Sequence, residues 1–204
     1  MGTKAELITS VQTVIGRDDK ASTIETFLSR AQRFLAANYN LPGIFTSLSE
    51  TLAASSQTIV IPSNNLRTSK MFYKDATSEE GGIIRPVSID YFKKNYYYPA
   101  KGPANPERFA IDPPARRWRF SSYPSNDITI EIEVVSVPPA ISDSQNSIII
   151  EGDDAISFLT ASYVLYSLGE DTRGKSNFGL AKIFAETLAS AHESNLSFLD
   201  GRDD

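Results

Sequence analysis

The sequence contains no cysteine and only one histidine, His192. Without cysteine, disulfides and thiolate metal sites are excluded, which fits a reducing compartment. One histidine excludes metal sites built on histidine pairs, and a Ser-His-Asp triad would have to use His192 itself. This residue follows Leu188 by one helical turn in a periodic segment, so an ordinary helix histidine is favoured over a catalytic base. We expect no metal and no cofactor.

Motifs of common enzyme classes are also missing. The chain has no G-x-S-x-G, no P-loop and no G-x-G-x-x-G after a strand. Asp153 and Asp154 could be paired carboxylates, but a helix start explains them more simply. Glu131 and Glu133 lie on the wet face of a predicted strand, and no second carboxylate cluster opposes them. We expect a protein that is not an enzyme and has no catalytic residue.

Long apolar runs are absent, and the N-terminus MGTKAELITSV lacks the pattern of a signal peptide. We therefore expect a protein that is neither exported nor membrane-spanning. The 204 residues are 41% hydrophobic and 22% charged, which is enough material for one large domain or two small ones with a real core.

Charge is distributed unevenly along the chain. Residues 1–66 are neutral overall, residues 67–119 carry a net charge of +5, and residues 120–204 carry −10. This layout suits head-to-tail contacts between like subunits at least as well as binding of a foreign polyanion. Solvated faces that differ by chance are the equally open alternative.

The clearest helix is expected at residues 153–168. Its apolar residues recur in steps of three, four and one, which places a broad stripe on one side of a helix. Asp153 and Asp154 put negative charge and an N-cap at its start, and Gly169 offers a left-handed end. A helix this apolar needs partners, so we expect the other elements to pack around it. The stripe consists of Ile156, Leu159, Tyr163, Val164, Ser167 and Leu168.

Three further helices follow from the same kind of pattern. Capping boxes at residues 3–6 and 22–25 each open an apolar repeat of helical period. The first repeat ends at Gly16 and the second before residues 42–43, Pro-Gly. A last helix is expected from about residue 177, with Phe178, Ala181, Phe184, Ala185, Leu188, Ala191 and Leu196 on its stripe.

Strands are expected where the apolar period changes to two, from about residue 55. The firmest is residues 128–137, where Ile128, Ile130, Ile132 and Val134 alternate with polar residues. Gly81-Gly82 favours a turn between two strands. Residues 92–107 are rich in Tyr, Lys and Pro, and we expect a long irregular loop there with more than a connecting role. The other strands are expected at residues 58–61, 67–73, 83–91, 108–111 and 118–120.

These elements predict an α+β fold. A small antiparallel helical bundle is built from both chain ends, residues 1–50 and 151–204, and an antiparallel β domain, residues 55–150, is inserted between them. The β domain carries the long Tyr/Lys/Pro loop, residues 92–107. Whether it is a closed barrel or an open sandwich stays open at this point.

Two tracts combine cations with aromatic side chains: the Tyr/Lys loop and residues 113–120, PPARRWRF. Such tracts hold single-stranded nucleic acid or anchor protein interfaces. The chain as a whole is acidic, so the interface is favoured, with Tyr96, Tyr97, Tyr98, Arg116 and Arg117 as candidates. Strand alternation gives Trp118 a third role, as a core residue, and for Trp118 this structural role is favoured.

The order of these features resembles the head-to-tail adaptor, or connector, proteins of tailed bacteriophages. The resemblance covers nearly the whole chain and rests on order more than on identity. It is carried by the opening helix pair with Ile15-Gly16-Arg17-Asp18, the strand Thr58-Ile59-Val60-Ile61-Pro62, the segment Phe109-Ala110-Ile111-Asp112-Pro113-Pro114, and the helix 154–168 with another after it. The Tyr-rich loop and the Asp-rich end depart from the pattern and leave the tail type open.

The resemblance implies a ring, usually of about twelve identical copies, under the portal protein of a filled capsid. Its partners would be other copies, the portal, a tail or nozzle protein and the passing genomic DNA, with no membrane. It would be assembled in the host cytoplasm and reside at the head–tail junction of the virion. By the same analogy Phe198 and Leu199 are candidates for docking to the portal, and the last turn of the final helix is the equal alternative. A binding module for carbohydrate or single-stranded nucleic acid, using the aromatic and basic β domain, is the alternative function.

Overall fold

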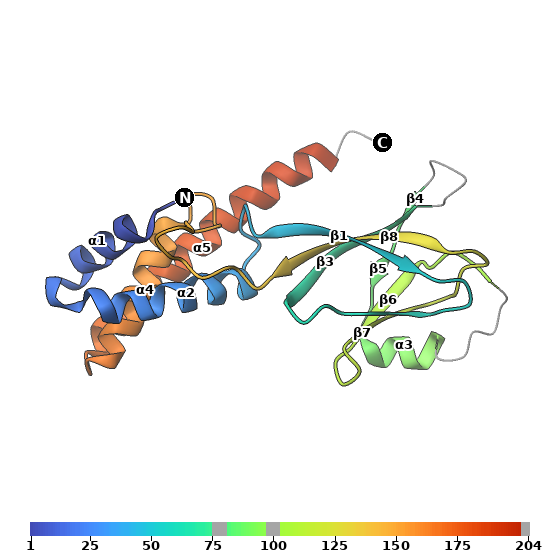
Figure 1. Cartoon of the computed structure of the whole chain (residues 1–204), viewed down its shortest axis with the longest axis horizontal. Helices are drawn as coiled ribbons and strands as arrows, with labels where there is room; N and C mark the ends of the chain where they lie inside the picture. Colours follow the sequence, from blue (N-terminus) through green and yellow to red (C-terminus); the bar gives the residue numbers. More distant parts are fainter. Residues whose placement is uncertain (75–80, 97–102, 201–204) are drawn as a thin grey trace. The chain divides into compact units, whose positions relative to one another are not determined.

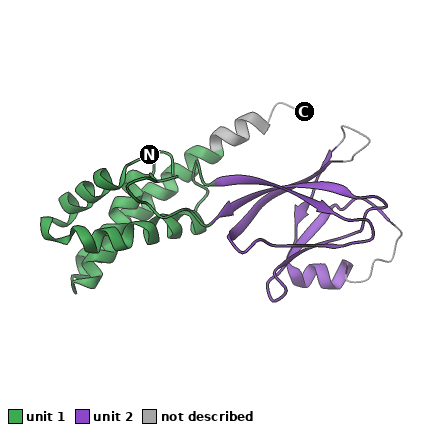
Figure 2. Cartoon of the chain, in the orientation of Figure 1, with its two compact units in different colours: residues 1–44, 137–204 green, residues 45–136 purple. Residues whose placement is uncertain are grey.

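Figure 1 shows the computed structural model, which describes residues 1–74, 81–96 and 103–200, with the side chains of residues 194–200 excepted. Its elements form two compact units (Figure 2). Unit 1 comprises Met1–Ile44 and Val137–Asp204 and is helical, and unit 2 comprises Phe45–Ser136 and contains both sheets and one short helix. The predicted α+β class is confirmed.

Unit 1 is organised around one central helix. Its elements are α1 (Lys4–Ile15), a 3-10 turn η1 (Asp18–Lys20), α2 (Ala21–Asn38), α4 (Asp153–Ser167) and α5 (Asp171–Asp200). The expected core helix is α4, and it packs against α1, α2 and α5. Because it has neighbours on three sides, its burial extends beyond the predicted stripe to small residues such as Ala161 and Ser162.

The helix ends agree with the sequence at some positions and not at others. Thr3 and Glu6 form the predicted capping box, and Gly16 ends α1 in a left-handed conformation with φ 71°. The second capping box was wrong: α2 begins at Ala21, directly after η1, and Ser22 lies inside the helix. Gly152, not Asp153, is the N-cap of α4, and Asp153 Oδ1 instead accepts a hydrogen bond of 2.8 Å from Gly2 N.

The segment of residues 137–152, which precedes α4, belongs to unit 1 and is held there by a buried amide. Gln32, on α2, donates from Nε2 to the carbonyl of Pro139 at 2.9 Å and accepts from the backbone N–H of Ile148 at 2.8 Å. Its side chain is fully buried. Since a buried amide is tolerated when its groups are paired, these two bonds both satisfy Gln32 and fix the segment's path.

Unit 2 is a sandwich of two four-stranded sheets. The first sheet has the order β1 (Phe45–Leu52), β8 (Ile128–Ser136), β3 (Asn65–Lys74), β4 (Gly81–Ile83), and the second has β2 (Thr58–Val60), β7 (Arg117–Phe120), β6 (Arg108–Asp112), β5 (Arg85–Pro86). All pairs are antiparallel except β5 with β6. Both sheets contribute to one core, which contains Trp118, so the sandwich and the structural role of Trp118 are established.

Several expectations for unit 2 were wrong. Strand β1 was not expected, and Gly81-Gly82 lies within β4 instead of forming a turn. The segment expected to be one strand at residues 83–91 contains the end of β4, all of β5 and the start of helix α3 (Ile89–Tyr96). This helix also takes the first part of the expected loop at residues 92–107, because Phe92 is buried and anchors it.

Candidate functional site

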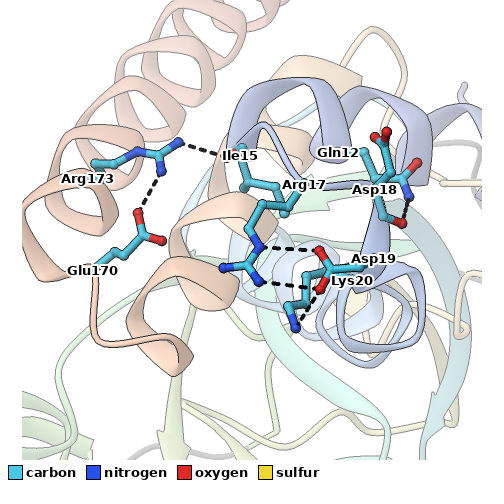
Figure 3. Close-up of polar contacts among 8 residues, drawn as sticks. All are labelled: Gln12, Ile15, Arg17, Asp18, Asp19, Lys20, Glu170 and Arg173. Atoms are coloured by element: carbon cyan, nitrogen blue, oxygen red, sulfur yellow. Dashed lines mark hydrogen bonds and ion pairs between the residues drawn. The ribbon is translucent and has the colours of Figure 1, made fainter.

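A cluster of polar contacts at the turns of unit 1 fixes where α5 begins (Figure 3). Arg173, in the first turn of α5, donates from Nη2 to the carbonyl of Ile15 at 2.9 Å and pairs through Nη1 with Glu170 at 2.6 Å. The carbonyl of Ile15 is among those left unpaired at the end of α1, so Arg173 caps one helix with a residue of another. The start of α5 is thereby tied to the end of α1.

The neighbouring turn between α1 and α2 is stabilised by charge. Arg17 Nε lies 3.2 Å from Asp19 Oδ1, and Lys20 Nζ lies 2.9 Å from Asp19 Oδ2 (Figure 3). The hydrogen bond from Arg17, with that from Lys20, lowers the pKa of the Asp19 carboxyl from 3.8 to about 2. These exposed pairs hold the turn in shape.

Helix α5 carries apolar side chains both on the face toward α4 and on an exposed face beside it. Its core face consists of small and aromatic residues, among them the buried Ala181 and Ala185, which allow close contact with α4. Leu180, Ile183 and Phe184 form a second face, which we name the α5 stripe; they are 42%, 59% and 40% exposed. Spacings of three and four place the three side chains together on one side of the helix.

Aromatic contacts hold α5 against its neighbours beneath this stripe. Phe184 stacks on Phe158 of α4 with ring centroids 5.4 Å apart and planes at 7°, and Phe178 meets Phe34 of α2 edge-on at 6.0 Å. Such ring pairs favour defined orientations. The α5 stripe is therefore an exposed apolar surface on a helix that ring contacts hold against α2 and α4.

Sequence reasoning placed Phe184 in the core and did not single out Leu180 or Ile183 as contacts. The sequence did contain a signal for them. Leu180 and Ile183 both lie off the stripe expected for the core, and Leu180 lies about one helical turn from Ile183 and from Phe184. An apolar group on the side of a helix that its core does not need is a reason to look for a partner.

In unit 2, the predicted residues Arg116 and Arg117 lie at and beside the turn between β6 and β7. Arg116 has a left-handed backbone with φ 47° and donates from Nη2 to the carbonyl of Pro62 at 3.2 Å. Arg117 opens β7, is exposed, and lies opposite Asp112 in the register. The turn thus presents two adjacent cations at one end of the sandwich.

Nearby, a third arginine is neutralised. Arg119 Nε lies 2.7 Å from Asp112 Oδ2, and this hydrogen bond lowers the pKa of the Asp112 carboxyl. Asp112 therefore stays ionised and offsets Arg119, while Arg116 and Arg117 carry the positive charge of the turn.

The structure describes one of the three predicted tyrosines. Tyr96 is the last residue of α3, half-buried, with its ring 5.6 Å from that of Phe92 and 6.2 Å from that of Tyr91. Helix α3 packs on β6, a strand of the sheet that also contains Arg117. Tyr97 and Tyr98 lie outside the described residues, as do the side chains of Phe198 and Leu199.

A groove of about 280 Å³ opens between the turn after β2 and the turn after β6, and we name it the sandwich-end groove. Ile111 lies in it and is 41% exposed, although its position in β6 is in phase with the core residue Phe109. Below it, Trp118 Nε1 donates to Thr68 Oγ1 at 2.8 Å. The lining includes Ile61, Asn65, Leu66, Arg67, Ile111 and Arg116.

The described residues show no preparation for metal chemistry or for a membrane. Among them, no group of three His, Cys, Asp or Glu side chains is arranged to hold a metal ion. None of the helices in the described ranges is long and apolar enough to cross a bilayer. His192 is half-buried on α5.

Unit 1 thus carries an exposed apolar helix face, and unit 2 carries a basic turn beside a groove. A family model described as SU10 adaptor protein matches residues 3–200. Because the match spans nearly the whole chain, the protein belongs to this family of bacteriophage head-to-tail adaptors. No curated protein matches the chain.

Membership confirms the resemblance read from the order of helices and strands. It gives the chain a structural adaptor role in a bacteriophage, interaction with other head or tail proteins, and a place in the virion.

Proposed function

We propose that copies of this chain form a ring beneath the portal protein, connect the capsid to tail or nozzle components, and line part of the channel through which the genome passes. The ring, of about twelve copies by family resemblance, is assembled in the host cytoplasm. Its action is mechanical: copies add to the portal, complete their contacts on docking, and hold the packaged DNA until ejection.

The α5 stripe is the observation that supports this proposal most directly. Three large apolar side chains lie exposed together on a helix that packs against α4 through Ala181, Ala185 and the ring of Phe184. Contiguous exposed apolar surface marks interaction sites, and a second copy of the chain is the partner that a homo-oligomeric adaptor requires. We assign the stripe to the contact between neighbouring copies.

Charge supports a contact in which different surfaces of two copies meet. Unit 1 carries a net charge of −6 and unit 2 a net charge of +1, with Arg116 and Arg117 at an exposed turn. A ring needs such a heterologous contact, because identical patches facing each other close a dimer instead. The acidic unit would also allow DNA, itself a polyanion, to slide without binding.

The other predicted interface residues keep a proposed role in assembly. Tyr96, Tyr97 and Tyr98 are proposed to contact a neighbouring copy or a tail protein. Deletion of residues 92–107 would remove the buried Phe92 and so damage unit 2 itself. Substitution of Tyr97 and Tyr98 by serine avoids this loss, and we expect it to weaken tail attachment while leaving unit 2 folded.

The experiment for the ring is light scattering of the purified chain, alone and mixed with portal rings, for wild type and for Ile183→Ser. Full burial of an isoleucine is worth about 1.5–3 kcal/mol, so covering its exposed part contributes roughly 1–2 kcal/mol at each contact. We expect Ile183→Ser to weaken assembly by about 5- to 30-fold.

Ile83→Ser is the matched control, because Ile83 lies in unit 2 and is 63% exposed, against 59% for Ile183. It should assemble like wild type. Equal loss in both variants would show that exposed apolar area in general, and not the α5 stripe, drives association. Failure of wild type to add to portal rings under any condition would overturn the proposed function.

A further inference from the structure

The sandwich-end groove has an unpaired acceptor in its lining. Asn65 Oδ1 is buried and has no hydrogen-bond donor among the described residues, while its Nδ2 donates to Thr68 Oγ1 at 3.4 Å. A buried acceptor without a donor is costly and uncommon in native proteins. Because this oxygen is buried, a ligand in the groove could reach it only if the Asn65 amide turned toward the groove; a peptide N–H would then supply the missing bond.

The lining of the groove also combines apolar side chains with positive charge. Ile61, Leu66 and Ile111 supply the apolar side chains, and Arg67 and Arg116 supply the guanidinium groups. A guanidinium carries five N–H donors, and the bond from Arg116 to the carbonyl of Pro62 uses one of them. Arginine forks match carboxylates in geometry as well as in charge.

Size separates the classes of ligand that could bind here. Small-molecule sites usually measure roughly 300–1,000 Å³, and this groove measures about 280 Å³ and is open to solvent. It is at the lower edge of that range and has room for one or two anchoring side chains of a peptide. The required peptide has a bulky apolar residue, a carboxylate close to it in sequence, and a free backbone N–H.

The chain itself contains such a segment in residues 198–204, FLDGRDD, in which residues 198–200 end α5, so the free N–H would come from a residue after Asp200. Phe198 and Leu199 are adjacent bulky apolar residues, and Asp200, Asp203 and Asp204 follow within five positions. This is the combination of an apolar anchor and nearby carboxylates that the groove calls for. The complementarity is chemical and does not depend on where the two units of one copy lie.

We infer that residues 198–204 of one copy dock in the sandwich-end groove of a neighbouring copy. An apolar side chain of the segment covers Ile111, an aspartate pairs with Arg116, and a backbone N–H donates to Asn65 Oδ1. The inference rests on the proposed ring, since it supplies a second contact between neighbours beside the α5 stripe. It differs from the expectation that Phe198 and Leu199 bind the portal.

The absence of native cysteine makes this testable by disulfide formation. Two full-length chains with different tags are co-expressed, one with Ile111→Cys and the other with Leu199→Cys, and the ring fraction is separated by size and oxidised. We expect a disulfide-linked heterodimer on non-reducing gels. Val60→Cys replaces Ile111→Cys in the control, because Val60 is 63% exposed and lies on the opposite face of the same sheet. This control should give no heterodimer.

Charge reversal provides the second measurement. A surface ion pair is worth up to about 1 kcal/mol, so Arg116→Glu should slow disulfide formation by about fivefold or more. Asp203→Arg with Asp204→Arg on the other chain should restore the rate. Restoration of the rate of disulfide formation supports the pairing of Arg116 with an aspartate of the segment. A rate that neither change affects overturns this pairing.

Each remaining outcome decides between the inference and the proposed function. Rings without the heterodimer overturn the inference and leave the ring intact. Failure of any ring to form overturns both. A third variant carries both Ile111→Cys and Leu199→Cys in one chain. If it forms the disulfide within the chain and the two single variants form no heterodimer, the segment binds the groove of its own chain, and the inference of docking to a neighbouring copy is overturned. Heterodimers of equal yield in the Val60→Cys control, or a photo-crosslinker at position 199 joined to the portal, also overturn it.

Discussion

Replacing Gln32 by leucine should destabilise unit 1 far more than a typical substitution of a polar residue. Gln32→Leu keeps the approximate volume of the side chain but leaves the N–H of Ile148 and the carbonyl of Pro139 without their partners. A buried group left unpaired costs about 1–3 kcal/mol. Both bonds lie in partly buried surroundings, so we expect a total loss of roughly 2–4 kcal/mol. Stabilities of native domains are about 5–15 kcal/mol, so this is a large fraction.

Urea unfolding separates the effect by unit. Circular dichroism at 222 nm reports chiefly on the helices of unit 1, while the fluorescence of Trp118, the one tryptophan, reports on unit 2. We expect Gln32→Leu to lower the midpoint of the first signal. Gln12→Leu is the matched control, because Gln12 also donates to a backbone carbonyl, that of Asp18 at 2.8 Å, but in an exposed position. A loss for Gln32→Leu no larger than for Gln12→Leu would refute the reasoning.

Two further predictions concern single side chains. Since the pKa of Asp19 is lowered to about 2, its contribution to stability should be complete above about pH 4 and be lost as the pH falls toward 2. Arg17→Met should raise the pKa of Asp19, as measured by carbon-13 NMR titration. An unchanged pKa would contradict the role of Arg17. Trp118→Phe removes the N–H that bonds to Thr68 and leaves a cavity in the sandwich. Calorimetry should therefore show a free energy of unfolding lower by about 2–4 kcal/mol. A decrease below about 0.5 kcal/mol would contradict the structural role of Trp118.

The elements that sequence reasoning found share strong local signals. The alternation of apolar and polar residues from Ile128 to Val134 predicted β8 correctly, because one face of that strand is buried and the other is more exposed to solvent. Thr3 and Gly16 marked the two ends of α1 through side-chain and backbone preferences that act within a few residues. The core helix α4 followed from its apolar content.

Strand β1 was missed because its apolar residues do not alternate. Phe45, Leu48 and Leu52 are spaced by three and four, a helical interval, and the strand has a paired neighbour only on the side of β8. Pairing with β8 over its whole length decides its conformation, and that partner lies far away in the sequence.

Helix α3 was missed for a different reason. The tract rich in Tyr and Lys was expected to be irregular, but the hydroxyl of Ser88 accepts from Tyr91 N at 3.2 Å and begins a helix that buries Phe92. Serine at a helix start is a recognisable signal, so this element could have been predicted.

The candidate surfaces were predictable only in part. Arg116 and Arg117 were singled out by their position next to Trp118 in an aromatic and basic tract. The sandwich-end groove could not be foreseen, because it joins the turn near Pro62 to the turn near Pro113, and only the pairing of β2 with β7 brings these turns together. Gln32 was likewise hidden, since nothing near it in sequence indicates the segment that it binds.

The account's central claim, that this chain is a structural part of the joint between capsid and tail, is tested most directly by cryo-electron microscopy of assembled virions. We predict a closed ring of copies directly beneath the portal, with α5 of each copy in contact with its neighbour. Virions with a complete head and tail and no copy of the chain at that joint would contradict the account.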